Sequence, residues 1–175
     1  QLQIWRPFID NDGVPRGTLG IPGIRTTWTD WGLPDVEREV VKQRTRKDGA
    51  VEIEERLRPA ASQAWITHRI TIHSQDSGSL FDAKGGGIVH HHVVEVPAAY
   101  PDLPRLGVSF PLPDSYVRVR WFGLGPHETE PDRRAAGLVG IYEQTIAEQF
   151  APYLRPQDCG HHVDTRWLEI LPERG

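Results

Sequence analysis

Glycine and proline occur so often along this chain that long helices are disfavoured. Fifteen prolines and seventeen glycines are spread over 175 residues, with no internal repeat and no low-complexity linker. Proline lacks a backbone donor and clashes with the preceding helical turn, and glycine is a poor helix former. The chain must therefore be built from short segments joined by turns, which favours β-strands.

Apolar residues at every second position indicate where these strands lie. Residues 35–58 predict two antiparallel strands joined by a hairpin turn at Lys47–Gly49. A second turn is expected at Lys84–Gly87, and residues 26–32 are expected to form one helical turn. The other expected strands are Leu2–Trp5, the run containing Ile66, Ile70 and Ile72, residues 88–96, the run Leu106, Val108 and Phe110, and the run Val117, Val119 and Trp121. About eight strands, with turns roughly every ten residues, predict an all-β antiparallel sandwich.

One segment fits two structures. Residues 133–150 are rich in alanine, and their apolar spacing suits a helix as well as a strand. Both alternatives stay open from the residues alone.

Composition and charge exclude several classes of function. A net charge of −4 and a pI of about 6.1 give no reason to expect a nucleic acid or membrane partner. No apolar run is long enough to span a bilayer, and the N-terminus lacks the features of a signal peptide. Cys159 is the only cysteine, which suits a cytoplasmic setting. The chain has no methionine and begins with Gln1, so we expect a processed chain or an excised piece.

Two adjacent histidines of a strand cannot share a face, but alternate ones can. His90 and His92 should therefore point to one face and His91 to the other. Such a pair can chelate a metal if a third ligand arrives from another strand, although histidines on a sheet face usually bind none. Residues 160–162 contribute two more imidazoles elsewhere in the chain.

Two of the six tryptophans are candidates for carbohydrate contact. Trp28 and Trp31 lie beside Asp30 in a segment that looks like a loop, so we expect them to be exposed. An exposed indole face suits the C–H face of a sugar, whereas the other tryptophans are expected to pack internally.

The segment WFGLGPHETEPDRR (residues 121–134) is the most polar turn of the chain. Glycosidases need two carboxylates facing each other across a cleft. Glu128, Glu130 and Asp132 alternate here, but nearby basic residues (His127, Arg133 and Arg134) would lower their pKa values and make them poor general acids. The chain has no nucleophile motif beyond a candidate thiol pair, Cys159 and His161. We therefore expect no catalytic residue in this chain.

This turn resembles a motif in the C-terminal β domain (small-chain region) of glycoside hydrolase family 2 β-galactosidases, W-x-G-x-G-P-x-E-x-Y-x-D-R. Glu130 stands where the family usually has tyrosine. The matching residues are Trp121, Gly123, Gly125, Pro126, Glu128, Asp132 and Arg133.

Three further stretches resemble the same domain in the same order: residues 3–13, 103–110 and 152–170. In the first, Arg6 and Pro7 are adjacent, so the alanine that separates them in the family is missing. In the last, Asp158 replaces the usual glutamate.

The resemblance implies an antiparallel supersandwich similar to that of galactose mutarotases. Residues 1–175 would form a partial copy, about the first two thirds of the domain. It also implies that residues 138–150 are extended.

The resemblance implies an accessory role in the hydrolysis of terminal β-D-galactosides. The family's catalytic glutamates and most of its sugar, Mg²⁺ and Na⁺ ligands lie in preceding domains, and a peripheral Na⁺ can be held by carbonyls matching Arg155 and Pro156. The implied partners are the other domains and, through them, the β-galactoside; the parent would be an oligomer and the isolated chain inactive. The alternatives are a free-standing carbohydrate-binding module and a mutarotase-like sugar epimerase.

The residue types of the motif predict a rigid structural corner. We expect Gly123 and Gly125 to adopt backbone angles closed to other residues, and Pro126 to fix φ, after a strand that ends at Trp121. Glu128 and Asp132 should accept hydrogen bonds from loop amides or from Arg133.

Overall fold

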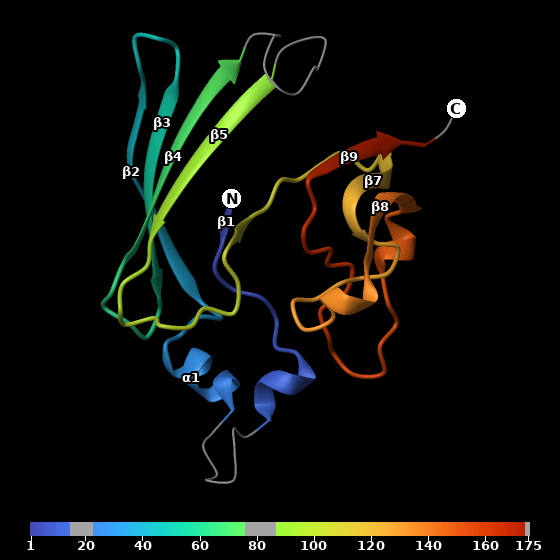
Figure 1. Cartoon of the computed structure of the whole chain (residues 1–175). Coiled ribbons are helices and arrows are strands. Elements are labelled where there is room, and N and C mark those ends of the chain that lie inside the picture. Colours follow the sequence, from blue (N-terminus) through green and yellow to red (C-terminus); the bar gives the residue numbers. More distant parts are fainter. Residues whose placement is uncertain (15–22, 76–86, 174–175) are drawn as a thin grey trace. The chain divides into compact units, whose positions relative to one another are not determined.

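Antiparallel β-strands are the main regular structure in the computed structural model, which describes residues 1–14, 23–75 and 87–173 (Figure 1). The chain divides into two compact units. The first contains Gln1–Pro7 and Pro15–Ser109, and the second contains Phe8–Val14 and Phe110–Gly175. The predicted all-β antiparallel class is confirmed. No helix within the described ranges is long and apolar enough to cross a membrane.

A four-stranded antiparallel sheet is the larger sheet of the first unit (Figure 1). Its strands are adjacent in space in the order of the sequence: β2 (Val36–Thr45), β3 (Val51–Pro59), β4 (Ile66–Gln75) and β5 (Gly87–Glu95). The hairpin predicted between β2 and β3 is confirmed, and Gly49 in its turn has a φ of 83° that favours glycine. The turn predicted at Lys84–Gly87 lies outside the described residues except for Gly87, which begins β5.

The remaining strands of the first unit are shorter than expected. Strand β1 (Leu2–Gln3) pairs with β6 (Gly107–Val108) over two residues only. The strands predicted at Leu2–Trp5 and Leu106–Phe110 are therefore wrong in length. Prolines lie close to both segments and cannot donate ladder hydrogen bonds, which limits the pairing.

Helix α1 (Ile24–Asp30) confirms the predicted helical turn. It places Trp28 in the core of the first unit, whose buried apolar residues also include Leu2, Ile4, Leu33, Leu57, Ile66 and Tyr100.

A three-stranded antiparallel sheet forms the centre of the second unit, in the order β8-β7-β9. The strands are β7 (Tyr116–Gly125), β8 (Leu138–Thr145) and β9 (Trp167–Pro172), and short 3-10 helices lie at Asp10–Gly13, Arg134–Ala136 and Ala147–Gln149. Within the ambiguous segment, Leu138–Thr145 is extended and the long helix is absent. The extended structure implied for residues 138–150 is therefore correct only as far as Thr145, because a 3-10 helix follows. The expected alternation in β7 is confirmed, because Val119 and Trp121 are buried on one face of the sheet.

Candidate functional site

The motif corner begins inside β7 rather than after it. The strand continues to Gly125, so its predicted end at Trp121 is four residues too early, and the Gly125–Pro126 peptide is cis. Trp121 is 1% exposed, and its indole nitrogen donates a hydrogen bond to the Leu124 carbonyl at 3.0 Å. The ring also packs against His162, with 4.2 Å between ring centroids. This tryptophan anchors the end of the central strand.

The two motif glycines are required for space, not for unusual backbone angles. Neither Gly123 nor Gly125 has a positive φ, so the conformational reason that we expected is wrong. A Cβ on Gly123 would lie 2.9 Å from the Cα of Thr165, and one on Gly125 would lie 2.7 Å from the Tyr142 ring. At Gly123 the neighbouring backbone leaves no room for a side chain, and at Gly125 the Tyr142 and Trp121 rings fill the space.

Glu128 holds the two sides of the corner together. One carboxylate oxygen accepts a hydrogen bond from Arg133 at 3.1 Å, and the other accepts one from the main-chain N–H of Gly160 at 3.1 Å. Arg133 also donates to the Tyr153 hydroxyl at 3.2 Å. The bonding predicted for Glu128 and Arg133 is confirmed, whereas Asp132 is exposed. The carboxylate therefore cross-links loop segments.

The next two residues extend the same connection. The Thr129 amide donates to the His161 carbonyl at 2.7 Å, and its hydroxyl accepts a hydrogen bond from the Val163 amide at 3.1 Å. Glu130, at the position where tyrosine is usual, contacts the Nδ1 atom of His161 at 2.9 Å. His161 is thus engaged by a carboxylate, and Cys159 lines a pocket with His162.

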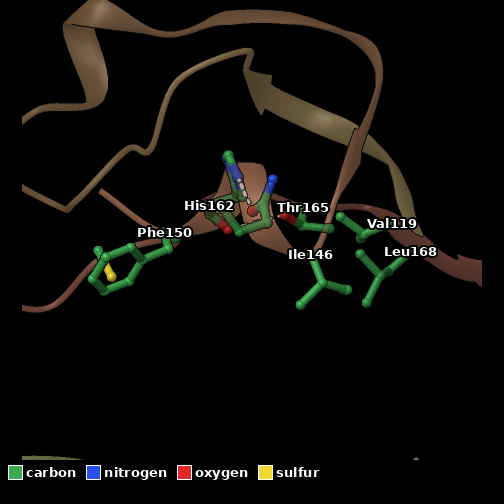
Figure 2. A pocket seen from close by; sticks show the side chains of 9 residues that line it. Val119, Ile146, Phe150, His162, Thr165 and Leu168 are labelled. Atoms are coloured by element: carbon green, nitrogen blue, oxygen red, sulfur yellow. Dashed lines mark hydrogen bonds between the residues drawn. The ribbon is translucent and has the colours of Figure 1, made fainter. Parts of the chain in front are cut away.

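Two adjoining pockets border the corner. The smaller is polar, with a volume of about 240 Å³, and the larger is mostly apolar, with a volume of about 570 Å³. Figure 2 shows the larger pocket, with Val119, Ile146 and Leu168 gathered on one side and the Phe150 ring on the other.

The polar groups around the smaller pocket are bonded mainly to one another. Glu148 accepts hydrogen bonds from the amide and hydroxyl of Thr145, at 2.7 and 2.9 Å. Gln149 contacts the Nε2 atom of His162 at 2.8 Å, and Gln144 donates to the Pro126 carbonyl at 3.3 Å. Burial lowers the pKa of His162 below its ordinary value of 6.5, so its ring is neutral at pH 7. These internal bonds indicate a structural corner.

The tryptophans predicted to be exposed lie in the first unit. Trp28 is only 5% exposed and donates to the Asp102 carbonyl at 2.9 Å, so the prediction of its exposure is wrong. The ring lies on the buried side of helix α1, which the interpretation of this segment as a loop did not foresee. Trp31 is half-buried and meets the Tyr100 ring edge-on at 5.5 Å.

The histidines of β5 meet two residues that sequence analysis did not single out. His90 and His92 share a face as predicted, with parallel rings 5.9 Å apart. His92 Nδ1 lies 2.9 Å from His68 Nε2, and His68 Nδ1 lies 2.7 Å from a Glu55 carboxylate oxygen. Among the described residues, no set of three or more His, Cys, Asp or Glu side chains is already arranged to hold a metal ion.

The carbonyl pair proposed for Na⁺ lies in the second unit. The Pro156 carbonyl accepts a hydrogen bond from the Asp10 amide at 2.8 Å, which uses one of its two lone pairs. The Arg155 side chain contacts the Asp10 carboxylate at 3.2 Å.

Comparison with known proteins gives one consistent family. A family model described as the β-galactosidase small chain matches residues 1–175. A β-galactosidase of Arthrobacter sp. is 29% identical over 97% of this chain, and one of Klebsiella pneumoniae is 31% identical over 81% of it. β-Galactosidase BgaC of Bifidobacterium adolescentis is 44% identical over 43% of it. The chain spans only 17%, 13% and 7% of the lengths of these relatives.

Proposed function

Because the chain belongs to the β-galactosidase small-chain family, we propose that it serves as an accessory β domain of an enzyme that hydrolyses terminal β-D-galactosides. The observation that carries this proposal is the family match over the whole chain. The proposal includes the supersandwich, of which this chain would be about the first two thirds.

The corner supports a role without catalytic carboxylates of its own. Retaining hydrolysis needs two carboxyl groups about 5–5.5 Å apart, one of them able to donate a proton. Glu128 is fixed by Arg133 and Gly160, and Glu130 contacts His161. Both carboxylates are thus engaged in contacts within the corner, which supports a structural role for them. The other domains would supply the reacting groups.

We propose that the other domains supply the metal ligands as well as the reacting groups. Mg²⁺ prefers several oxygen ligands in octahedral geometry, and the described residues hold no such cluster of carboxylates. The Pro156 carbonyl already accepts a hydrogen bond from the Asp10 amide, which leaves it one lone pair for Na⁺. We propose that the full-length enzyme binds Mg²⁺ and Na⁺ mainly through its other domains.

Exposed apolar side chains support burial of the second unit against other parts of the enzyme. Ile141 is 65% exposed, Phe150 67% and Leu154 104%. Exposed large apolar side chains occur on both units but are more numerous on the second, which favours a contact surface there. The proposed partners are the remaining domains, in a cytoplasmic oligomeric enzyme that takes a β-galactoside substrate.

A contribution to carbohydrate binding would fall to Trp31, since Trp28 is buried. The free-standing binding module remains the alternative function. It requires a sugar-stacking ring in this chain, and Trp31 has part of its surface exposed.

The test is an assay of the isolated 175-residue chain with a chromogenic β-galactoside, alongside calorimetric titration with galactose and lactose. We expect neither turnover nor saturable binding. Turnover by the chain alone would overturn the accessory role. Saturable binding that is lost in Trp31→Ala but kept in Trp65→Ala would favour the binding module.

A further inference from the structure

Strand β9 leaves one edge of the three-stranded sheet open. The order β8-β7-β9 places β7 in the middle, so β9 (Trp167–Pro172) pairs with β7 on one side and, among the described residues, with no strand on the other. In an antiparallel ladder the main-chain N–H and C=O groups of successive residues point to opposite sides of the strand, so about half of those of β9 face outward.

The sequence of β9 is typical of an interior strand. Natural edge strands are protected against further pairing by charged side chains, prolines or bulges. The run WLEIL, which precedes Pro172, contains one charge, Glu169, and this carboxylate accepts a hydrogen bond from Arg120 of β7 at 2.6 Å. The pairing of this run with β7 is regular, from Arg118 to Phe122. The open edge therefore carries little protection of its own.

The larger pocket lies on one face of the sheet beside this edge. Leu168 of β9 is opposite Trp121 of β7, and Val119 shares their face because it is two residues away in its strand. Leu168 and Val119 line the pocket, and the Phe150 ring stands on its other side (Figure 2). Val119 is 7% exposed, whereas Leu168 is 55% and Phe150 67% exposed. The pocket is thus an apolar hollow with a buried floor and an open mouth.

The side chains around this pocket determine what can fill it. No Asp, Glu, Lys or Arg lines it, and burial lowers the pKa of His162, so that ring is neutral at pH 7. A charged group placed there would lose its hydration without gaining a partner. His162 contacts Gln149 at 2.8 Å, and the Thr165 hydroxyl donates to the His162 carbonyl at 2.9 Å, so these polar groups are already bonded. The pocket therefore fits uncharged apolar side chains.

An added strand would satisfy the edge and the pocket together. A strand that pairs with β9 places every second side chain on the pocket face, next to Leu168. This chain spans only 17% of the length of the Arthrobacter β-galactosidase and 13% of that of the Klebsiella enzyme, so most of each relative lies outside the matched region. Another part of the same polypeptide is then the source of the strand.

We propose, on the basis of the accessory role proposed above, that β9 is an interior strand in the complete enzyme: an extended segment from outside residues 1–175 pairs with its open edge and places uncharged apolar side chains in the larger pocket. This contact removes an unprotected strand edge from the surface of the enzyme.

The test is hydrogen exchange at single-residue resolution, measured on the complete polypeptide and on the 175-residue chain. A strand with two partners has all of its N–H groups bonded, whereas an edge strand leaves every second one open. In the 175-residue chain, alternate amides of residues 168–171 should exchange rapidly. In the complete polypeptide these amides should exchange roughly a hundredfold more slowly. Strand β7 has partners on both sides and should be protected in both samples, which shows that each is folded.

Two matched variants test the pocket. Leu168 and Leu106 are 55% and 56% exposed in this chain, and Leu106 lies in the first unit. In the complete polypeptide, Leu168→Lys should return the outward-facing amides of β9 to rapid exchange, because a charge would enter the apolar contact. Leu106→Lys should leave them protected.

The proposal is overturned if every second amide of β9 still exchanges rapidly in the complete polypeptide, or if Leu168→Lys leaves β9 as protected as Leu106→Lys does. Protection that depends on protein concentration also overturns it, because the partner would then be a second copy. An assay of the complete polypeptide with a chromogenic β-galactoside separates this contact from the accessory role. Turnover with an open β9 edge refutes the added strand alone, and an absence of turnover refutes the accessory role.

Discussion

Replacing Gly123 by alanine should lower the free energy of unfolding by about 1–3 kcal/mol, the usual cost of adding a methyl group to a well-packed site. The new Cβ would lie 2.9 Å from the Cα of Thr165 and 3.0 Å from the main-chain oxygen of Asp164. Carbon atoms pack best at about 3.5–4.0 Å, and neither of these backbone atoms can rotate away. The loop must shift, which strains the nearby 2.8 Å hydrogen bond from the Arg166 amide to the Phe122 carbonyl.

The assay is urea unfolding followed by circular dichroism, with Gly107→Ala as the matched control. Gly107 also lies in a strand, has no positive φ, and has no atom within 4 Å of an added Cβ. Alanine there should be neutral or should stabilise the protein by about 0.4–1 kcal/mol. Equal unfolding midpoints for the two variants would refute the argument that close approach of the 164–165 backbone requires glycine at position 123.

Three further changes test the core, the corner and the buried imidazole. Trp28→Ala should lower the free energy of unfolding, measured with urea, by about 3–5 kcal/mol, because the ring packs in the core of the first unit. A loss below about 1 kcal/mol would mean that the ring does not pack there. Glu128→Gln should lower the free energy of unfolding by less than about 1 kcal/mol at neutral pH, because water screens the half-exposed Arg133 and the new amide oxygen can still accept a hydrogen bond from Gly160. A much larger loss would contradict the view that the Glu128–Arg133 contact is weak. Burial lowers the pKa of folded His162 below 6.5, so the unfolded chain takes up the proton first and stability should fall as pH drops below 6.5. His162→Gln should flatten that part of the pH–stability profile, and an unchanged slope would exclude His162 as its cause.

Elements whose burial follows a local period were predictable from the sequence. Val117, Val119 and Trp121 alternate with polar residues, and β7 forms there because one face of its sheet is buried. The hairpin around Gly49 was predictable for the same reason, because its turn residues lie within the hairpin itself. The lengths of β1 and β6 were not predictable, since each depends on a partner about a hundred residues away.

The candidate site shows the same limit. The neighbouring Arg133 made it foreseeable that an acid of the corner would contact a base. The roles of Thr129 and Gly160 were not foreseeable, because their hydrogen bonds join residues about thirty positions apart. Glu55 and His68 were missed for a similar reason. They meet because the register of β3 and β4 places them opposite each other, and no pattern within either strand indicates that register.

The bonds between residues 128–130 and 160–163 determine how this corner could be transplanted into another β protein. A graft of residues 121–134 alone would bury Thr129, which is 1% exposed here, without partners for its amide and hydroxyl. Each orphaned group would cost about 1–3 kcal/mol. The portable unit is therefore two separate stretches of chain moved together. The linker between them can vary in length at little cost, because the entropy of closing a loop grows only slowly with its length.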